Sequence, residues 1–562
     1  MMDRNTLTAL LLITVVLIIT PYYMELISPT TKDTQEYFED QQNTDESGVI
    51  YKDYNEDIST PSAPTTPVFS QKEEKTIEIE NDLFIARISS LYGGTIRSFK
   101  TKEHLKNDSS LVELISQENK NNLILSYKDF TGEDITIDDG WVLQEKEDSF
   151  FITSTKTFTY INEFENKKLI KTLTFYPDKF VIDIDIDITA MSNNILANNF
   201  SIEWVGGIPP TEKDSIAEAA YFYSYLYQGG ELLDVKVGSD ETFKNDYKGA
   251  TDWIATRSKY FVVCILDDSK EQFVGSAISA SFKDKELYNI SAQMKSDKIA
   301  NISLYLGPLE YERIKNLGVN LELVMDFGWA IIRPISKSVL WVLKTMHTVI
   351  PNYGVILIIF SILVKLIVYP LTKRSYQSTQ AMQSIQPEVN ALREKHKNNP
   401  TKLNQATMEL YKKKGVNPLG TCFPMLLQMP LLFALFTVFR STIELRGEPF
   451  VFWIKDLSAP DVLFYLPFKI PLYGNYVCAL PILMALSMYA QQKMMQPNNA
   501  TGPQADQQKM MQYFMMGFFF LLFNSFPSGL NLYYTLFNIL TIAQQKLTKN
   551  DKTTLATTKT QA

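Results

Sequence analysis

Residues 352–372 form an apolar run, NYGVILIIFSILVKLIVYPLT, which is long enough to cross a lipid bilayer and contains one charge. That charge is Lys365. An ionisable side chain at the centre of a membrane helix costs roughly 2.5–3.5 kcal/mol on insertion scales. The residues alone leave two interpretations open. Lys365 either extends its long side chain to the cytoplasmic headgroups or provides a fixed positive charge in a watery cavity.

Charge is divided unevenly along the chain. Residues 333–562 carry 23 Lys and Arg against 9 Asp and Glu. Since the whole chain has 54 and 63, residues 1–332 carry 31 and 54. The basic part also contains nearly all the long apolar runs. This division is typical of a membrane protein with basic cytoplasmic loops and a soluble domain on the other side.

Residues 1–24 begin with the charged Arg4 and continue as an apolar run of about the length of a membrane span. A cleaved signal peptide is the alternative, but the sequence TPYYMEL makes a poor cleavage site. We therefore expect an N-terminal transmembrane anchor that starts in the cytoplasm. Residues 25–74 are rich in Thr, Asp, Glu, Gln, Ser and Pro, which predicts a disordered periplasmic linker.

Residues 75–326 consist of short alternating segments separated by Gly, Asp and Asn. The clearest is FVIDIDIDI at residues 180–188, in which apolar and acidic residues alternate with the period of a strand. Many such segments predict one large all-β sandwich domain. The aromatic run at residues 220–227 is interpreted as strand packing, with a binding face as the alternative. Cys264 is the domain's single cysteine, which excludes an internally disulfide-stapled fold.

Residues 327–350 predict an amphipathic helix. Apolar residues recur there at helical spacing with Lys337 and Lys344 between them. Trp329 and Trp341 suit the headgroup region of a bilayer. We expect this interfacial helix to lie on the membrane surface. A helix that caps the β-domain is the alternative.

Four further apolar segments follow, at residues 418–440, 474–491, 510–526 and 529–547. Together with the anchor and the run at residues 352–372, they predict six transmembrane helices, five of which form a core within residues 351–549. The excess of Lys and Arg after the second span and in the C-terminal tail places both in the cytoplasm, and the β-domain in the periplasm. Residues 550–562 are expected to form a short disordered cytoplasmic tail.

Residues 373–417 predict an antiparallel helical hairpin in the cytoplasm. Apolar residues recur at helical spacing on both sides of NNP (398–400), Pro387 kinks the first arm, and Gly415 is a C-cap glycine. Ribosomal RNA, anionic lipid or an acidic protein could meet its basic faces, and a merely solvated face is the alternative. The basic residues are Arg393, Lys395, Lys412, Lys413 and Lys414.

Lys365 has no Asp or Glu within the predicted spans to pair with. A buried cation without a counter-charge is unusual unless water or a transient guest provides one. Polar side chains that could line a hydrated groove are numerous, although hydrogen bonding between helices explains each of them singly. They are Ser361, Gln428, Asn524, Ser525, Asn531, Tyr533, Tyr534, Asn538 and Thr541. No Cys or His cluster has the spacing of a metal site.

Several motifs resemble those of the YidC family of membrane protein insertases from Gram-negative bacteria. The order of anchor, β-domain, amphipathic helix and five further spans is also similar. The resemblance is close over residues 327–547 and looser in the β-domain. Its motifs are VKLIVYPLT (364–372), QPEVNALREK (386–395), KGVNPLGTCFPMLLQMPLLFALF (414–436), FWIKDLSAPD (452–461) and FPSGLNLYY (526–534).

The resemblance implies a non-enzymatic insertase and chaperone without cofactors, which acts on nascent inner-membrane proteins alone or with the Sec translocon. It implies a supersandwich β-domain and a hydrophilic groove whose single basic residue attracts acidic substrate residues. Lys365 occupies that position, where the family usually has arginine. The ribosome, the signal-recognition machinery and anionic lipids are further expected partners. The expected substrate-contacting residues are Ser361, Tyr369, Gln428, Asn531, Tyr533, Tyr534 and Asn538.

Two other classes of function are alternatives to the insertase. A transporter or channel predicts paired charges, ion ligands or repeat symmetry in the spans, and the sequence shows none. A membrane-anchored carbohydrate-active enzyme predicts convergent carboxylates in the β-domain. Acidic residues are plentiful there, but no constellation stands out. The insertase is therefore the leading hypothesis.

Overall fold

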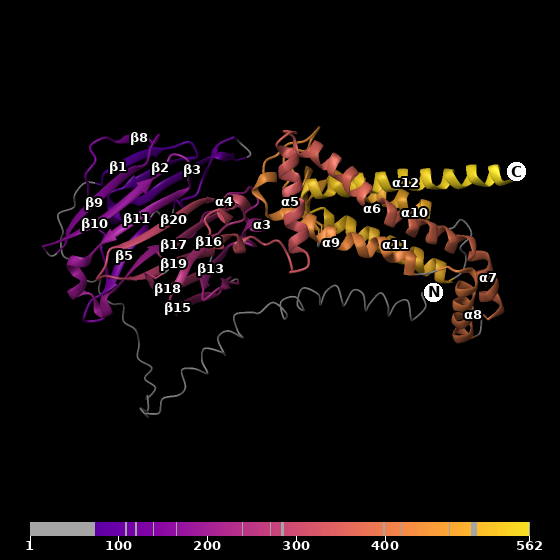
Figure 1. The fold of residues 1–562 in the computed structure, drawn as a ribbon, viewed down its shortest axis with the longest axis horizontal. Coiled ribbons are helices and arrows are strands. Elements are labelled where there is room, and N and C mark those ends of the chain that lie inside the picture. The colour runs from indigo at the N-terminus through magenta and orange to yellow at the C-terminus, as the bar shows by residue number, and fades with distance from the viewer. Residues whose placement is uncertain are drawn as a thin grey trace, which may run out of the picture. The chain divides into compact units, whose positions relative to one another are not determined.

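The computed structural model describes residues 74–560, except for residues 107–108, 118–120, 139, 165, 239, 270, 283–285, 397–398, 417–418, 471–472 and 496–502. The expected anchor at residues 1–24, and the expected linker up to residue 73, lie outside the described residues. The rest divides into a β-rich part followed by a helical part, drawn in indigo to magenta and in orange to yellow (Figure 1).

The β-rich part contains three sheets. The five-stranded sheet comprises β1 (Thr76–Glu80), β2 (Phe84–Ser89), β3 (Thr95–Leu105), β4 (Leu111–Glu113) and β8 (Ser149–Phe151). The six-stranded sheet comprises β5 (Asn122–Lys128), β6 (Asp134–Thr136), β12 (Asn199–Trp204), β15 (Thr242–Lys248), β18 (Phe273–Phe282) and β19 (Glu286–Lys295). The strand orders are β4-β3-β2-β1-β8 and β15-β18-β19-β12-β5-β6.

The third sheet has nine strands. They are β7 (Val142–Leu143), β9 (Lys156–Phe164), β10 (Lys167–Phe175), β11 (Val181–Asp187), β13 (Tyr223–Gln228), β14 (Glu231–Val235), β16 (Thr251–Arg257), β17 (Phe261–Asp267) and β20 (Ala300–Pro308). Their order is β14-β13-β16-β17-β20-β11-β10-β9-β7.

Strand β11 shows why this sheet forms. Ile182, Ile184 and Ile186 are fully buried, whereas the aspartates between them lie on the other face. The period-two pattern therefore supplies one apolar face to the core. It confirms the strand predicted at residues 180–188. The aromatic run at 220–227 also enters a strand, β13, where Tyr227 stacks on Trp253 with ring centroids 5.5 Å apart.

Short helices connect these strands and lead to the helical part. The α-helices are α3 (Ser215–Ala219) and α4 (Tyr311–Lys315), and the 3-10 helices are η1 (Leu91–Gly93), η2 (Thr189–Asn194), η3 (Leu196–Asn198) and η4 (Leu321–Val324). The helical part comprises α5 (Arg333–His347), α6 (Tyr353–Ser384), α7 (Gln386–Lys395), α8 (Pro400–Lys414), α9 (Leu419–Ser441), η5 (Ile443–Leu445), α10 (Ala479–Met495), α11 (Pro503–Phe523) and α12 (Ser528–Thr560).

Helix α6 contains the apolar run. Its N-cap is Asn352, whose side chain accepts a hydrogen bond from the Val355 amide at 3.0 Å. Its 32 residues give a length of about 48 Å, which exceeds a hydrocarbon core of about 30 Å. Among the described residues, α6 is the one helix long and apolar enough to span a membrane by length and composition. The six predicted spans therefore stay a prediction.

Three boundaries differ from the expectations. Helix α6 continues to Ser384, and Pro387 lies in the first turn of α7, so it begins a helix rather than kinking one. Residues 474–478, expected at the start of a span, form strand β22 instead, because aromatic and β-branched residues there pair with an earlier strand. Helix α12 continues to Thr560, past the start of the expected disordered tail, since no Gly or Pro follows Gly529.

Helix α5 uses its apolar face for packing within the protein. Val339, Leu340 and Leu343 are buried, and α5 contacts α9 and α6. Trp341 lies exposed on the opposite face. The predicted amphipathic helix is therefore present, but helices of the core cover its apolar side. Its position at the membrane surface stays a prediction.

Candidate substrate groove

Lys365 lies within α6 with its side chain turned toward α12. The residue is only 7% exposed. Its Nζ donates a hydrogen bond to Thr541 Oγ1 at 2.7 Å and lies 4.4 Å from the centroid of the Phe537 ring. No carboxylate forms an ion pair with Lys365 in the part of the chain that the structure describes. The ammonium is thus held by one hydroxyl and one ring face.

The Thr541 hydroxyl is oriented by its own helix. It donates to the Phe537 carbonyl at 2.7 Å, which leaves its lone pairs for the ammonium of Lys365. A Thr hydroxyl is neutral, so it satisfies one donor of the ammonium without cancelling its charge. This arrangement keeps a positive charge available beside α12.

Polar side chains continue on both sides of this contact. Asn538 Nδ2 donates to Ser487 Oγ of α10 at 3.0 Å. Gln544 Nε2 donates to Thr372 Oγ1 of α6 at 3.0 Å. These pairs and the Lys365–Thr541 pair form what we call the polar seam, which joins α12 to α6 and α10. Helices α10 and α6 both contact α12.

Tyr533 and Tyr534 precede the polar seam on α12. Both side chains are buried, and neither hydroxyl has a hydrogen-bond partner among the described residues. Their rings pack edge to face with centroids 5.2 Å apart, and Tyr533 also packs near Phe360. Buried hydroxyls normally have partners. These two donors could therefore bind a polar group of a guest.

The remaining expected contact residues have different surroundings. Ser361 is fully buried and donates to the Leu357 carbonyl of its own helix at 2.7 Å. Asn531 Nδ2 donates to the Phe523 carbonyl at 3.0 Å, which ties the end of α11 to the start of α12. Tyr369 is partly exposed and Gln428 is half-buried. The structure thus brings Lys365 and Asn538 to one seam, whereas Asn531 closes a turn.

Four residues of this region are not among the predicted site residues. They are Thr372, Ser487, Phe537 and Gln544. A signal existed on α12, where Tyr534, Phe537, Thr541 and Gln544 follow one another at spacings of three and four, so they share one face of the helix. No such pattern marks Ser487 or Thr372, which are recognised only by what they contact.

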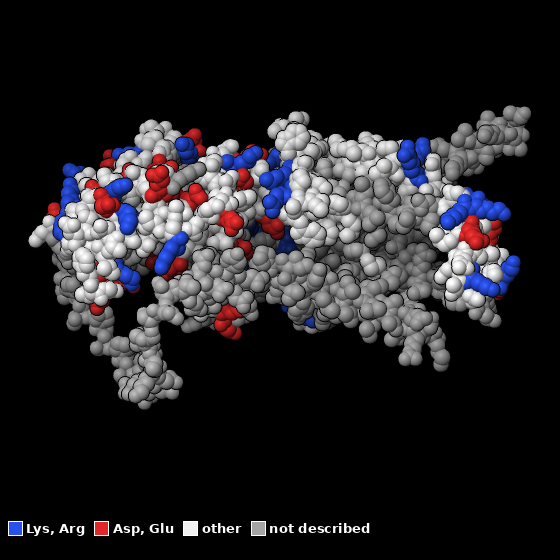
Figure 2. All heavy atoms as spheres, turned by 60° about the horizontal axis from the view of Figure 1, so that its bottom comes forward, with Lys and Arg blue, Asp and Glu red and all other residues white. Residues whose placement is uncertain are grey.

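Helices α7 and α8 carry the predicted basic surface (Figure 2). They contact each other, and Lys414 Nζ lies 2.5 Å from Glu388 Oε1. Lys395, Lys412 and Lys413 are exposed. Figure 2 also shows many charged side chains on the β-rich part, of both signs.

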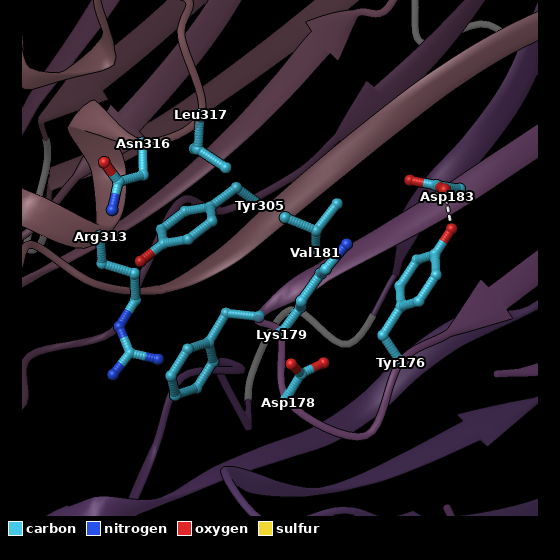
Figure 3. A pocket seen from close by; sticks show the side chains of 10 residues that line it. Tyr176, Asp178, Lys179, Val181, Asp183, Tyr305, Arg313, Asn316 and Leu317 are labelled. Carbon is cyan, nitrogen blue, oxygen red and sulfur yellow. Dashed lines mark hydrogen bonds between the residues drawn. The ribbon is translucent and has the colours of Figure 1, made fainter. Parts of the chain in front are cut away.

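A pocket of about 410 Å³ lies on the β-rich part (Figure 3). Asp183 in its wall accepts hydrogen bonds from the Tyr176 hydroxyl and, at 2.7 Å, from Ser303 Oγ. The bond to Asp183 raises the pKa of Tyr176 to about 12. Arg313 is held in ion pairs with Glu103 at 2.9 Å and Glu310 at 3.0 Å. These charged groups are thus already engaged within the chain. The pocket lining is Tyr176, Asp178, Lys179, Phe180, Val181, Asp183, Tyr305, Arg313, Asn316 and Leu317.

Two protein-family models match almost the whole described chain. Residues 76–342 match the YidC periplasmic domain, and residues 345–555 match the 60Kd inner membrane protein. The chain is 34% identical to the membrane protein insertase YidC of Chlorobium limicola, over 97% of this chain and 94% of the relative. This chain belongs to the YidC family of membrane protein insertases.

Other YidC relatives show similar identity. The chain is 35% identical to the YidC of Chlorobium luteolum, over 97% of this chain and 94% of the relative. It is 36% identical to the YidC of Chlorobaculum tepidum, over 84% of this chain and 81% of the relative. The predicted membership of the YidC family is confirmed.

Two solved structures are also similar. An active YidC insertase matches with a TM-score of 0.35 and 16% identity, over 84% of this chain and 92% of that chain. A galactose mutarotase-like protein from Lactobacillus casei matches with a TM-score of 0.25 and 12% identity, over 42% of this chain and 99% of that chain.

Membership of the YidC family shows where the β-rich part and the helical part belong in the cell. All strands from β1 to β20 fall within the matched periplasmic domain, so the β-rich part is periplasmic. Helices α6 to α11 fall within the matched 60Kd inner membrane protein. The chain is thus an insertase of the inner membrane, in a family of insertases rather than of enzymes.

Proposed function

We propose that this chain inserts and helps to fold inner-membrane proteins through a hydrated groove along the polar seam. In this proposal the ammonium of Lys365 attracts an acidic residue in the translocating segment of the substrate. One observation carries the proposal. Lys365 is a buried cation held by a hydroxyl, with no carboxylate partner among the described residues.

The physical argument concerns the counter-charge. A buried cation without an anion is unstable relative to the same cation in an ion pair. A substrate carboxylate that enters the seam supplies that anion for the time of its passage. The hydroxyls of Tyr533 and Tyr534 offer additional donors to a polar segment. Release of the substrate's apolar helix into lipid then provides the driving force.

The proposal includes the membrane arrangement. Six spans cross the membrane, namely an anchor in residues 1–24 and a five-helix core in residues 351–549. Both termini and the hairpin at residues 373–417 lie in the cytoplasm, and residues 25–74 link the anchor to the periplasmic domain at 75–326. The charge distribution along the chain supports this orientation.

The proposed partners follow from the same arrangement. Nascent inner-membrane proteins enter the groove, alone or beside the Sec translocon. The exposed lysines of α7 and α8 bind the ribosome, the signal-recognition machinery or anionic lipids. Substrate contacts are proposed for Ser361, Tyr369, Gln428, Asn531, Tyr533, Tyr534 and Asn538.

Substitution of Lys365 tests the proposal in cells depleted of their own insertase. The substrate is a small single-span protein with an acidic translocated tail. Lys365→Ala removes a charge-assisted contact worth about 1.5–3 kcal/mol, so insertion should fall by about tenfold or more. Lys365→Arg should retain insertion, because it keeps the charge.

Two controls isolate the charge. Leu366→Ala alters the exposed neighbour of Lys365 and should leave insertion unchanged. A substrate with its acidic residues changed to Asn and Gln should be inserted equally well by the wild type and by Lys365→Ala. Equal insertion of the acidic substrate by the wild type, Lys365→Ala and Lys365→Arg would refute the electrostatic role.

A further inference from the structure

A two-stranded hairpin precedes α10, in a region for which the sequence predicted only the start of a span at residue 474. Strand β21 (Val462–Ile470) pairs antiparallel with β22 (Gly474–Cys478), with Val462 opposite Cys478 and Tyr465 opposite Tyr476. No further strand joins this sheet among the described residues. An isolated hairpin of two strands is at best marginally stable in water.

The hairpin exposes apolar side chains on both of its faces. Phe464 is 55% exposed and Phe468 is 62% exposed, and the neighbouring Leu463 and Tyr465 are exposed as well. Successive residues of a strand point to opposite faces, so neither face is polar. A hairpin in water normally keeps one polar face. This pattern suits a segment that contacts an apolar medium on both sides.

Two buried side chains fix the base of the hairpin. Asp461 Oδ2 accepts hydrogen bonds from Trp453 Nε1 at 2.9 Å and from the Ala479 and Leu480 amides at 3.1 and 2.8 Å. Asn524 donates to the Tyr473 and Tyr476 carbonyls at 2.8 and 2.9 Å. The hairpin is thus attached firmly to the N-terminus of α10 and the end of α11, and its exposed residues are held outward.

The hairpin lies on the periplasmic side of the helical part. The segment before it carries Arg446, whose Nε lies 2.6 Å from Glu212 of the periplasmic domain. Its C-terminal strand ends at Cys478, directly before the apolar helix α10. Exposed apolar side chains continue from the hairpin onto α10 at Ile482, Leu483 and Leu486. The apolar surface is therefore continuous from the hairpin to a helix of the membrane core.

The chemistry of this surface favours lipid over a protein partner. Tyr and Trp side chains are enriched at the level of the headgroups, and Trp453 and Tyr465 would lie there. Phe452 is 89% exposed beside Trp453. Residues 462–495 contain no Asp or Glu, and Lys469 is the one charge within the two strands. A lysine beside exposed aromatic rings matches the phosphate and acyl regions of a phospholipid.

We propose that the β21–β22 hairpin inserts its aromatic side chains into the periplasmic leaflet of the inner membrane, with Lys469 at the lipid phosphates. The hairpin then anchors the periplasmic ends of α10 and α11 at the boundary between lipid and water. This inference does not depend on the role of Lys365, so the two can fail separately.

Spin labels on the full chain test the proposal. The three native cysteines are first replaced by serine, and the background is accepted only if it supports growth of insertase-depleted cells. Single cysteines then replace Phe464 or Phe468, and the labelled chain is reconstituted in vesicles of phosphatidylethanolamine and phosphatidylglycerol. Relaxation by oxygen reports contact with acyl chains, and relaxation by a water-soluble nickel chelate reports contact with water.

Two reference positions calibrate the measurement. Leu366, exposed on α6, represents a side chain facing lipid, and Ile216, 87% exposed in the periplasmic domain, represents one facing water. We expect labels at 464 and 468 to resemble the label at 366. Relaxation of these labels by oxygen and by the nickel chelate that resembles the relaxation of the label at 216 would overturn the proposal. Protection from both reagents would also overturn it, because it would show a protein partner or a second copy of the chain on this surface.

Discussion

Lys365 and Thr541 are 176 positions apart in the chain and meet in a single hydrogen bond. The bond fixes the ammonium on the α12 side of the polar seam. It leaves the charge uncompensated, which is the property that the proposed function requires. In the proposed function, Thr541 positions Lys365 and does not touch the substrate itself.

Thr541→Val tests this role, because valine keeps the shape of threonine and removes the hydroxyl. Loss of a hydrogen bond to a charged group should lower the free energy of unfolding by about 1.5–3 kcal/mol. Insertion of the acidic-tailed substrate should also fall. Thr541→Ser keeps the hydroxyl, so it should retain the wild-type free energy of unfolding and the wild-type insertion. Thermal unfolding in detergent and insertion of matched acidic and neutral substrates measure the two effects. An equal loss for both substrates would show a purely structural role.

Lys171 is a second buried lysine, in the core of the periplasmic domain. It is completely buried, and its Nζ donates to the Leu123 carbonyl at 2.7 Å and the Tyr92 carbonyl at 3.0 Å. Burial lowers the pKa of Lys171 to about 7. Between that pKa and the unfolded value of about 10.4, the unfolded state binds more protons than the folded state. This group therefore makes stability rise with pH in that window.

Lys171→Met should remove this contribution. Between pH about 7 and about 10.4, the free energy of unfolding of the wild type should gain up to about 1.4 kcal/mol per pH unit relative to the variant. Below this window both states are protonated, and the difference between the proteins should be constant. Chemical denaturation of both proteins across this range is the measurement. Parallel curves for the two proteins would show that Lys171 does not titrate there.

Asp461 shows how one side chain can organise several elements. It caps α10 through two amides and holds the Trp453 indole, so it joins the loop, the hairpin and the helix. Its position at a helix N-terminus also suits a negative charge. Asp461 thus lies at the point where the β21–β22 hairpin joins α10.

Asp461→Ala should loosen the hairpin, because it leaves three donors without an acceptor. The loss of the cap alone should cost about 1–2 kcal/mol of stability. Limited proteolysis should cut within residues 462–478 faster in this variant, and Asp461→Asn should be intermediate. Lys455→Ala, which removes an exposed charge from the same loop, is the matched control. Unchanged cleavage in Asp461→Ala would show that Asn524 alone holds the hairpin.

The molecule as a whole joins its periplasmic domain to the helical core through ion pairs. Arg446 pairs with Glu212 at 2.6 Å, and both side chains are largely buried. Lys344 of α5 lies 3.0 Å from Glu310 and 3.1 Å from Glu444, so it connects residues of both parts. The rings of Tyr260 and Phe261 lie beneath the Arg446 guanidinium. These contacts connect the two parts.

Arg446→Ala should weaken this coupling strongly. Removing one partner of a buried pair costs about 3–5 kcal/mol, because the other charge is left uncompensated. We expect the thermal unfolding of the full chain to separate into two transitions. Arg87→Ala, which breaks an exposed pair with Glu78, should change stability by only about 0–1 kcal/mol. One unchanged transition in Arg446→Ala would show that the pair contributes little.

Part of this organisation was predictable from local patterns. The alternation at residues 180–188 predicted β11, and the helical spacing of apolar residues predicted α5, since both signals depend on neighbours within a few positions. The buried charge in α6 identified Lys365 as a candidate site because a lysine in an apolar run is costly. The sequence motifs indicated membership of the YidC family. None of these inferences needed a contact between distant residues.

Contacts across the chain decided the rest. The Lys365–Thr541 and Asn538–Ser487 pairs became parts of the polar seam only when α6, α10 and α12 packed together. The same packing brought the Phe537 ring beside the Lys365 ammonium. The pairing of Val462 with Cys478 forms a hairpin that the sequence did not predict. Arg446 met Glu212 across 234 positions. Local periodicity indicates which face of a segment is apolar, but it does not indicate which distant segment covers that face, because many partners satisfy the same pattern.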